Sequence, residues 1–244
     1  MMDNKNINES YSDKIFRKSV AAQEQAQQIV ELFSRGGMEE LHAHFLDVKQ
    51  LMSCFRCAIL EVETKFRVLD EQLSLQYERN PIDSITSRLK SPESIYEKIM
   101  RKNLPADIKS IEEHLSDVAG VRVVCSFVND VYMLAECLLR QDDVKLIEMK
   151  DYIKNPKPNG YRSLHLIIEI PIFLTDEKKM MKVEVQIRTV AMDLWASIEH
   201  KIYYKKQRGD EKAKIAAERL LKCAETSAML DEEMQSIRDF VDAE

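Results

Sequence analysis

A chain of 244 residues is long enough for one well-packed domain with helical additions, and it is short for two full domains. Its composition, 45% hydrophobic and 32% charged, is typical of a soluble globular protein, and the formal net charge of −6 argues against a general nucleic-acid binder. No run of apolar residues is long enough to predict a membrane span, and the N-terminus has no apolar signal core. We therefore expect a cytoplasmic protein with no membrane partner and no stable nucleic-acid partner.

The first third of the chain is predicted to be helical after a short tail. Residues 1–13 have the composition of a disordered segment, and a short helix is expected over residues 13–33. A longer helix is expected over residues 38–76, because apolar residues recur there at helical spacing. Cys54 and Cys57 form a C-x-x-C in this helix, but there is no second pair, so core packing is favoured over a metal or redox site.

The middle and the end of the chain alternate between strand and helix patterns. Strands are predicted over residues 85–90, 121–127, 146–152, 163–172 and 181–188, with a turn near Asp176. Helices are predicted over residues 91–102, 106–115, 130–139, 191–205 and 211–241, the first with Ser91 as N-cap and Pro92 at its first position. This order predicts an α/β (α+β) fold with a mixed five-stranded sheet packed with helices. We expect a tail and helical arm over residues 1–82, a sheet core over residues 83–206 and a C-terminal helical extension over residues 207–244.

Polar side chains share one face of the predicted sheet, because side chains alternate between the two faces of a strand. If the strands are neighbours, this face gathers Asp117, Arg122, His165, Glu184, Gln186 and Arg188. An ordinary half-exposed strand gives the same alternation, so the pattern alone leaves both interpretations open. Two separated carboxylates among basic groups are nevertheless what a magnesium–polyphosphate site needs, since Mg²⁺ takes a few hard oxygens from the protein and the rest from phosphate and water.

Four cations precede this face in the segment from Arg88 to Arg101. Arg88 and Lys90 alternate onto one face of a strand end, whereas Lys98 and Arg101 are three apart on the following helix and share a face. The N-terminus of that helix, with Ser94 in its first turn, is itself an anion site. A single solvated lysine would mean little, but this density of charge favours a triphosphate cradle.

The segment KDYIKNPKPNGYRSLH, residues 150–165, carries more chemistry than a connection between two strands requires. Tyr161 follows Asn159-Gly160, where the backbone can turn sharply and present an aromatic ring. That ring either stacks on a nucleobase or simply packs at the start of the strand. The basic side chains that would surround phosphates are Lys150, Lys154, Lys157 and Arg162. The loop is therefore a candidate second nucleotide pocket.

Four segments together resemble a known family. They are SRLKSPESIYEKIMRK, DVAGVRVVCSFVNDVY, KDYIKNPKPNGYRSLH and VEVQIRTVAMDLWASIEHKIYYK, and they occur in family order over about residues 84–205. They are similar to the synthetase domain of the RelA/SpoT homologues, enzymes that make the alarmones pppGpp and ppGpp. The resemblance implies a nucleotidyltransferase-like synthetase fold. It also implies transfer of the β,γ-pyrophosphate of ATP to the ribose 3′-hydroxyl of GTP or GDP, with release of AMP.

The resemblance implies roles for individual residues as well. Arg88 and Arg122 should sandwich the adenine, and the ATP phosphates should be held by Lys90, Ser94, Lys98 and Arg101. Asp117 and Glu184 should bind Mg²⁺. Glu184, alongside Gln186, is the candidate for activating the 3′-hydroxyl. The guanine nucleotide should be bound by Lys150, Lys157, Asn159, Tyr161, His165, Gln186 and Asp193, with Tyr161 stacked on the base.

Asp193 departs from the family pattern, because many small members carry an asparagine at this place that contacts guanine. An aspartate can accept hydrogen bonds from both the ring N–H and the exocyclic amine of guanine, so we expect guanine binding to persist.

Two absences favour a stand-alone small alarmone synthetase: the sequence has no His-Asp dipeptide of a hydrolase domain, and it has no ribosome-sensing C-terminal domains. In that group the final helices commonly build a homotetramer. The apolar stripe Ile215, Leu220, Ala224, Met229 and Ile237 either serves that assembly or packs on the sheet. Two alternative functions stay open, namely a toxin-type relative that pyrophosphorylates the 3′ end of tRNA, and a catalytically inactive nucleotide-binding sensor. The second would be expected to lack Asp117 or Glu184, and both are present.

Overall fold

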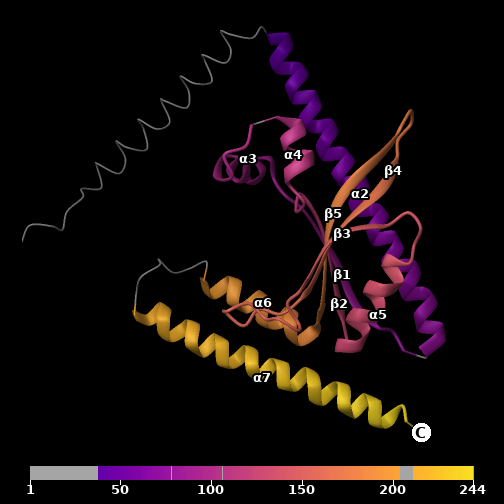
Figure 1. Cartoon of the computed structure of the whole chain (residues 1–244), viewed down its shortest axis with the longest axis vertical. Helices are drawn as coiled ribbons and strands as arrows, with labels where there is room; N and C mark the ends of the chain where they lie inside the picture. The colour runs from indigo at the N-terminus through magenta and orange to yellow at the C-terminus, as the bar shows by residue number, and fades with distance from the viewer. Residues whose placement is uncertain (1–37, 78, 106, 204–210, 244) are drawn as a thin grey trace, which may run out of the picture. The chain divides into compact units, whose positions relative to one another are not determined.

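The computed structural model of this chain describes residues 38–77, 79–105, 107–203 and 211–243 (Figure 1). The chain forms two compact units, residues 1–50 and 51–244, and the described part of the first is the start of helix α2 (Met38–Tyr77). The expected tail and the short helix that follows it lie outside the described residues. No described helix is long and apolar enough to cross a membrane.

A five-stranded mixed sheet forms the centre of the second unit, as predicted. Its strands are β1 (Ile82–Leu89), β2 (Ala119–Cys125), β3 (Lys145–Asp151), β4 (Leu164–Phe173) and β5 (Lys178–Thr189). The order across the sheet is β1-β2-β5-β4-β3, in which β2 and β5 run parallel and the other neighbours run antiparallel. The neighbouring strands β2 and β5 therefore come from distant parts of the sequence.

The remaining helices of the second unit begin and end within a few residues of the predicted positions. They are α3 (Pro92–Arg101), α4 (Ile108–His114), α5 (Val128–Leu139), α6 (Val190–Tyr203) and α7 (Glu211–Val241). The start of α3 is the predicted one, because the hydroxyl of Ser91 accepts the N–H of Ser94 at 3.3 Å and Pro92 occupies the first turn.

Alternate residues of β4 and β5 face the apolar core. Those fully buried are Leu164, Leu166, Ile168, Ile170, Met181, Val183, Val185 and Ile187, and they form one cluster with residues of α2 and α5. Each such side chain stabilises the fold by about 1.5–3 kcal/mol. Cys54 is buried in the same cluster and Cys57 packs against it, which confirms the packing interpretation of the C-x-x-C.

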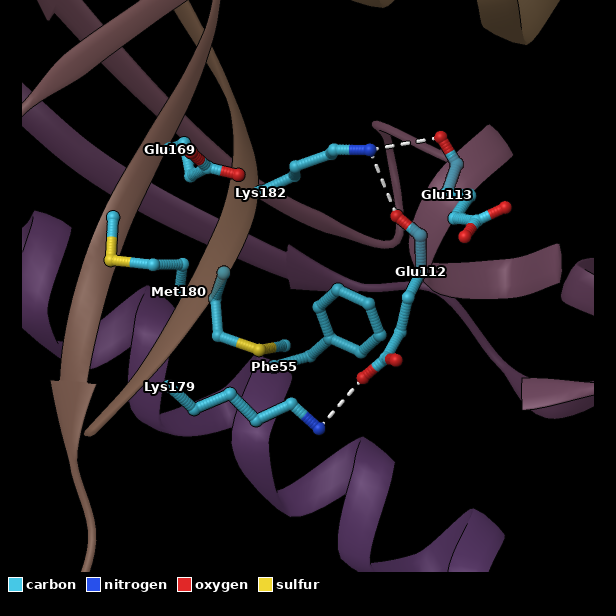
Figure 2. A pocket seen from close by; sticks show the side chains of 8 residues that line it. Phe55, Glu112, Glu113, Glu169, Lys179, Met180 and Lys182 are labelled. Atoms are coloured by element: carbon cyan, nitrogen blue, oxygen red, sulfur yellow. Dashed lines mark hydrogen bonds and ion pairs between the residues drawn. The ribbon is translucent and has the colours of Figure 1, made fainter. Parts of the chain in front are cut away.

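Polar contacts fasten the end of α4 to strand β5, in a hollow that also contains Phe55 (Figure 2). The ammonium group of Lys182 donates to the carbonyl oxygens of Glu112 and Glu113, at 2.9 and 2.8 Å, and Lys179 pairs with the Glu112 carboxylate at 2.7 Å. A lysine that donates to the last carbonyls of a helix acts as its C-terminal cap. The chain that leaves α4 is thereby held beside β5, where Asp117 follows three residues after the helix ends.

The apolar stripe of α7 is divided between two environments. Leu220 and Ala224 are buried against Trp195 of α6, whose indole N–H donates to the Leu220 carbonyl at 2.8 Å. Figure 1 shows α7 running alongside α6. Ile215, Met229 and Ile237, by contrast, are 50%, 61% and 51% exposed. Neither alternative predicted for the stripe applies to all five residues, because only part of this long helix is covered by the rest of the unit.

Candidate active site

A hollow on the polar side of the sheet brings together residues of β1, β2 and β5. Its lining residues are Thr86, Ser87, Arg88, Lys90, Asp117, Gly120, Val121, Arg122, Glu184 and Gln186. The strand register explains this grouping, because Gly120 pairs with Arg88 on one side and with Glu184 on the other, while Arg122 pairs with Gln186. Gly120 has no side chain, so the floor between Arg88 and Glu184 stays open. The predicted gathering of both carboxylates with basic residues is present.

Asp117 keeps its charge although it is half-buried. Its Oδ2 atom lies 2.6 Å from the ammonium groups of both Lys90 and Lys98. Burial alone would raise the pKa of the Asp117 carboxyl, but the hydrogen bonds from the two lysines hold this pKa below its usual value. The second oxygen, Oδ1, is buried and has no hydrogen-bond partner among the described residues. This oxygen of Asp117 is therefore available to a ligand.

Glu184, the second carboxylate, is oriented by two neighbours. Nδ1 of His165 lies 3.3 Å from Oε1, and the amide of Gln186 donates to Oε2 at 3.0 Å. Burial would raise the pKa of Glu184, but the hydrogen bonds from His165 and Gln186 outweigh it and lower the pKa. The charge of Asp117 acts on the same group in the opposite direction, so the two carboxylates interact electrostatically.

These two carboxylates fit a magnesium ion. Mg²⁺ prefers hard oxygen ligands and completes its shell with water and phosphate oxygens, so one or two protein carboxylates suffice. The unpartnered Oδ1 of Asp117 and the ionised Glu184 provide such oxygens in one hollow. Groups of three or more His, Cys, Asp or Glu side chains with metal-binding geometry are absent from the described residues, which argues against a site made of protein ligands alone.

Tyr161 lies next to this hollow and packs at the start of the strand, while its stacking on a nucleobase stays a prediction. Its hydroxyl is 2.8 Å from Nε2 of His165, and its ring packs against the cluster around Trp195. The ammonium group of Lys157 lies 4.8 Å from the centre of the ring. Burial raises the pKa of the Tyr161 hydroxyl, which therefore stays protonated at neutral pH. The ring is thus packed at the strand start and also borders the carboxylate site.

Arg188 connects several of the predicted residues, although the sequence assigned it no role beyond its place on the polar face. Its Nη2 atom donates to the Tyr161 hydroxyl at 2.5 Å and to Oε1 of Gln186 at 2.7 Å. Nη1 donates to Asp193 at 3.1 Å, and Nε donates to the hydroxyl of Ser163 at 3.4 Å. The sequence indicated Arg188 only through the alternation of polar and apolar residues along β5, in which Arg188 is the last polar residue of the pattern.

Asp193 joins the two sides of the site. Besides accepting from Arg188, it lies 3.3 Å from a guanidinium nitrogen of Arg122, which lines the hollow. The predicted contact of Asp193 with guanine stays a prediction, since the carboxylate is paired with two arginines here.

The other predicted residues are more peripheral. Lys150 is the register partner of His165 but is exposed, and it pairs with Glu148 at 2.9 Å. Asn159 accepts the N–H of Tyr161 at 3.2 Å and so shapes the turn. Arg101 is exposed at the end of α3.

Two loop cations that were expected around phosphates have other contacts. Arg162 donates to the carbonyl of Ile153 at 3.2 Å, within the loop itself, and Lys154 lies 5.0 Å from the centre of the Tyr132 ring. Loop length and charge could not predict this, because the direction of these side chains depends on how the turn closes.

Known proteins share this arrangement. The family described as a region found in RelA / SpoT proteins matches residues 87–209. GTP pyrophosphokinase YwaC from Bacillus subtilis (strain 168) is 43% identical over 205 residues, which cover 84% of this chain and 97% of that protein. The crystal structure of small alarmone synthetase 2 from Bacillus subtilis matches with a TM-score of 0.71 at 43% identity and covers 79% of this chain and 98% of that one. Small alarmone synthetase 1 from the same organism, bound to its product pppGpp, matches with a TM-score of 0.71 at 36% identity, covering 80% and 98%.

The two relatives are matched over nearly their full length, and the family match over residues 87–209 includes both carboxylates, Asp117 and Glu184. The chain therefore belongs to the RelA/SpoT family, as one of its small alarmone synthetases.

Proposed function

We propose that this protein transfers the β,γ-pyrophosphate of ATP to the ribose 3′-hydroxyl of GTP or GDP, making pppGpp or ppGpp and releasing AMP. The observation that carries this proposal is the pairing of two ionised carboxylates, Asp117 and Glu184, in one hollow lined by Arg88, Lys90 and Arg122. The relative YwaC is named a GTP pyrophosphokinase, and small alarmone synthetase 1 was solved with pppGpp.

The donor nucleotide occupies the side of the site made by β1, β2 and α3. Arg88 and Arg122 clasp the adenine, and the phosphates are held by Lys90, Ser94, Lys98 and Arg101. This assignment is supported by the position of Lys90 and Lys98 at the Asp117 carboxylate, where each ammonium can neutralise both protein and polyphosphate charge. Such a site works mainly by alignment and charge neutralisation, since pyrophosphoryl transfer needs no covalent intermediate on the protein.

Asp117 and Glu184 hold Mg²⁺ in this proposal. When bound, the ion supplies charge neutralisation to the transferred group. Glu184 also accepts the proton of the 3′-hydroxyl as the new bond forms between the 3′-oxygen and the β-phosphorus. The bond between that phosphorus and the oxygen bridging to the α-phosphate breaks, and AMP leaves with this oxygen. The lowered pKa of Glu184 keeps the carboxylate ionised at neutral pH and able to take the proton.

The acceptor occupies the side made by the loop over residues 150–165. Tyr161 stacks on guanine and Gln186 helps to place the 3′-hydroxyl, while the remaining contacts come from Lys150, Lys157, Asn159, His165 and Asp193. The position of Tyr161 beside His165, and of His165 beside Glu184, supports this assignment.

The substrates also support a cytoplasmic location, where ATP and guanine nucleotides are abundant. We further propose that the protein is a homo-oligomer, a tetramer by its resemblance to the small synthetases. The exposed apolar residues of α7, among them Ile215, Met229 and Ile237, are available for such contacts.

The proposal is tested by incubating the purified protein with Mg²⁺, γ-labelled ATP and, separately, GTP, GDP, GMP or bulk tRNA. Label should move to GTP or GDP, and Glu184→Gln should abolish the transfer while leaving the thermal unfolding curve unchanged. Label on tRNA with none on free nucleotides would identify a tRNA modifier instead. Binding of nucleotides without any transfer would identify a sensor.

A further inference from the structure

Arg188 is an unusual residue to find inside this fold. Only 5% of its side chain is exposed, and a buried guanidinium costs free energy unless its charge and its donors are satisfied. Its donors are satisfied, but its carboxylate partner, Asp193, is shared with Arg122. Replacing a whole buried ion pair by apolar residues often leaves the stability of a fold unchanged, so stability alone does not explain why this pair is present. The buried charge of Arg188 is therefore better explained by a role in the candidate active site.

Two hydrogen-bonded routes run from Arg188 to Glu184. In the first, the oxygen of Tyr161 accepts from Arg188, so the hydroxyl proton is directed to Nε2 of His165 and the Nδ1 proton of His165 faces Glu184. In the second, Oε1 of Gln186 accepts from Arg188, so the amide Nε2 is turned to donate to Glu184. Arg188 thus determines the direction of the donors on both sides of the Glu184 carboxylate.

We propose that Arg188 is the positioning residue of the acceptor pocket, which holds Tyr161, Gln186 and Asp193 in one arrangement before the guanine nucleotide binds. The inference rests on the function proposed above. Arg188 lies under the acceptor residues and is not among the residues that line the donor hollow. Its effect should therefore fall mainly on the acceptor, since preorganised side chains lose less freedom when the acceptor binds, whereas Arg188 reaches the donor side only indirectly, through Asp193 with Arg122 and through Gln186.

A guanidinium is suited to this task because its planar fork carries five N–H donors in fixed directions. Arg188 uses three of its nitrogens on four partners, and its carbon also lies 5.1 Å from the centre of the Tyr161 ring. A lysine keeps the charge but is a single point donor on a flexible stem. Arg188→Lys therefore separates the effect of charge from the effect of geometry.

The test compares wild type with Arg188→Lys and Ser163→Ala in two measurements. Ser163→Ala removes the partner of the Arg188 Nε atom and loosens the guanidinium, and it also removes a hydrogen bond between the Ser163 and Tyr161 side chains. Calorimetric titration without turnover gives the affinity for GDP alone and for a non-hydrolysable ATP analogue alone. Steady-state kinetics gives kcat and the KM of each substrate. We expect Arg188→Lys to weaken GDP binding about 10- to 100-fold, Ser163→Ala to weaken it less, and both to leave binding of the ATP analogue nearly unchanged.

Arg79→Lys is the matched control, because Arg79 also makes a paired contact with a buried carboxylate, Asp130, and is not among the residues that line the hollow. It should lower the melting temperature and leave both affinities as they are. A loss of ATP-analogue binding equal to the loss of GDP binding, or no loss of either, would overturn the inference.

A double variant gives a second check on how Arg188 acts. If Arg188 acts through Tyr161, then Arg188→Lys combined with Tyr161→Phe should lose little more GDP affinity than the worse single variant, whereas fully additive losses would contradict it. If wild type binds GDP but transfers no pyrophosphate, the proposed function is wrong, and the GDP titrations still decide the role of Arg188.

Discussion

At the scale of single residues, the site works by keeping charges in places where burial opposes them. Asp117 and Glu184 are both partly buried, and in both the pKa is lowered by hydrogen bonds that outweigh desolvation. Each carboxylate is stabilised by partners on its own side, Lys90 and Lys98 for Asp117 and His165 with Gln186 for Glu184. Substitution of Asp117 should therefore disturb the two lysines, whereas substitution of Glu184 should disturb His165 and Gln186.

Asp117→Asn should lower the rate of pyrophosphate transfer by at least about 100-fold, because a neutral amide cannot balance Lys90 and Lys98 or bind the ion in the same way. Extra Mg²⁺ should restore little of the rate. The measurement is the initial rate over a Mg²⁺ titration. Asp143→Asn serves as control, since it breaks a similar 2.6 Å pair with Lys65 away from the hollow and should change the rate by less than about twofold. If extra Mg²⁺ fully restores the rate of Asp117→Asn, the role of Asp117 is limited to increasing the affinity for the ion.

The residues that the sequence predicted are those whose place follows from strand alternation. The face with Asp117, Arg122, His165, Glu184 and Gln186 could be predicted because period-two alternation and strand adjacency determine it. The network around Arg188 could not, since it depends on side-chain directions and on Ser163 and Asp193 meeting at the end of one strand. Local patterns carry no information on such contacts.

At the scale of elements, helix α7 does more than extend the chain, because it packs directly on the acceptor loop. Gly160 has φ +89°, and a side-chain carbon added there would lie 2.5 Å from the Cβ of Ala224 and 3.2 Å from Leu221. Tyr161, the next residue, packs on the cluster of Trp195, Leu220 and Ala224. The conformation of the loop and the placement of the helix are therefore linked.

Gly160→Ala should destabilise the protein by about 1–3 kcal/mol, since it adds both a positive-φ penalty and a clash with Ala224. It should also weaken the guanine nucleotide more than ATP. Ala224→Gly alone should cost about 1 kcal/mol as a glycine inside a helix. In the double variant the clash is relieved but the φ penalty remains, so urea unfolding should show less destabilisation than the sum of the single variants. If the losses in the free energy of unfolding of the two single variants simply add in the double variant, Ala224 of α7 does not contact the loop at Gly160 as described.

Most element boundaries were predicted to within a few residues, and the differences have local causes. Strand β1 begins at Ile82 and not at Ile85, because Ile82 pairs with Cys125 across an irregularity in the register that interrupts alternation. Strand β5 begins at Lys178 and not at Met181, because it forms a long hairpin with β4. The first residues of β5 are rich in lysine, so the apolar alternation does not extend to them. The coverage of α7 could not be predicted, since a helix of mixed polarity does not reveal which of its apolar residues meet a neighbour.

At the scale of the whole molecule, the order of the strands would separate the two substrates in the proposed function. Strands β1 and β2 lie on the proposed donor side, β3 and β4 flank the loop proposed to bind the acceptor, and β5 in between carries Glu184. The exposed apolar residues of α7 lie outside this arrangement of site residues. The proposed assembly can therefore be tested without altering the site itself.

Met229→Lys combined with Ile237→Lys should reduce the molar mass measured by light scattering, because a charge in an apolar contact opposes association. Ser236→Lys is the control, since it adds one of these two charges to α7 without deleting an apolar side chain. If the mass of the double variant equals that of wild type, α7 does not form the contact between copies.

The parallel pairing of β2 with β5 has a consequence for a chain still being synthesised. Between Cys125 at the end of β2 and Lys178 at the start of β5 lie a helix and two further strands, so the pair closes across a long sequence separation. Pairings of this kind form late, because the loop entropy must be overcome before the contact stabilises the chain. A nascent chain on the ribosome would carry Asp117 and its lysines long before Glu184 emerges. Until Glu184 has emerged, the nascent chain therefore lacks one of the two carboxylates of the proposed site.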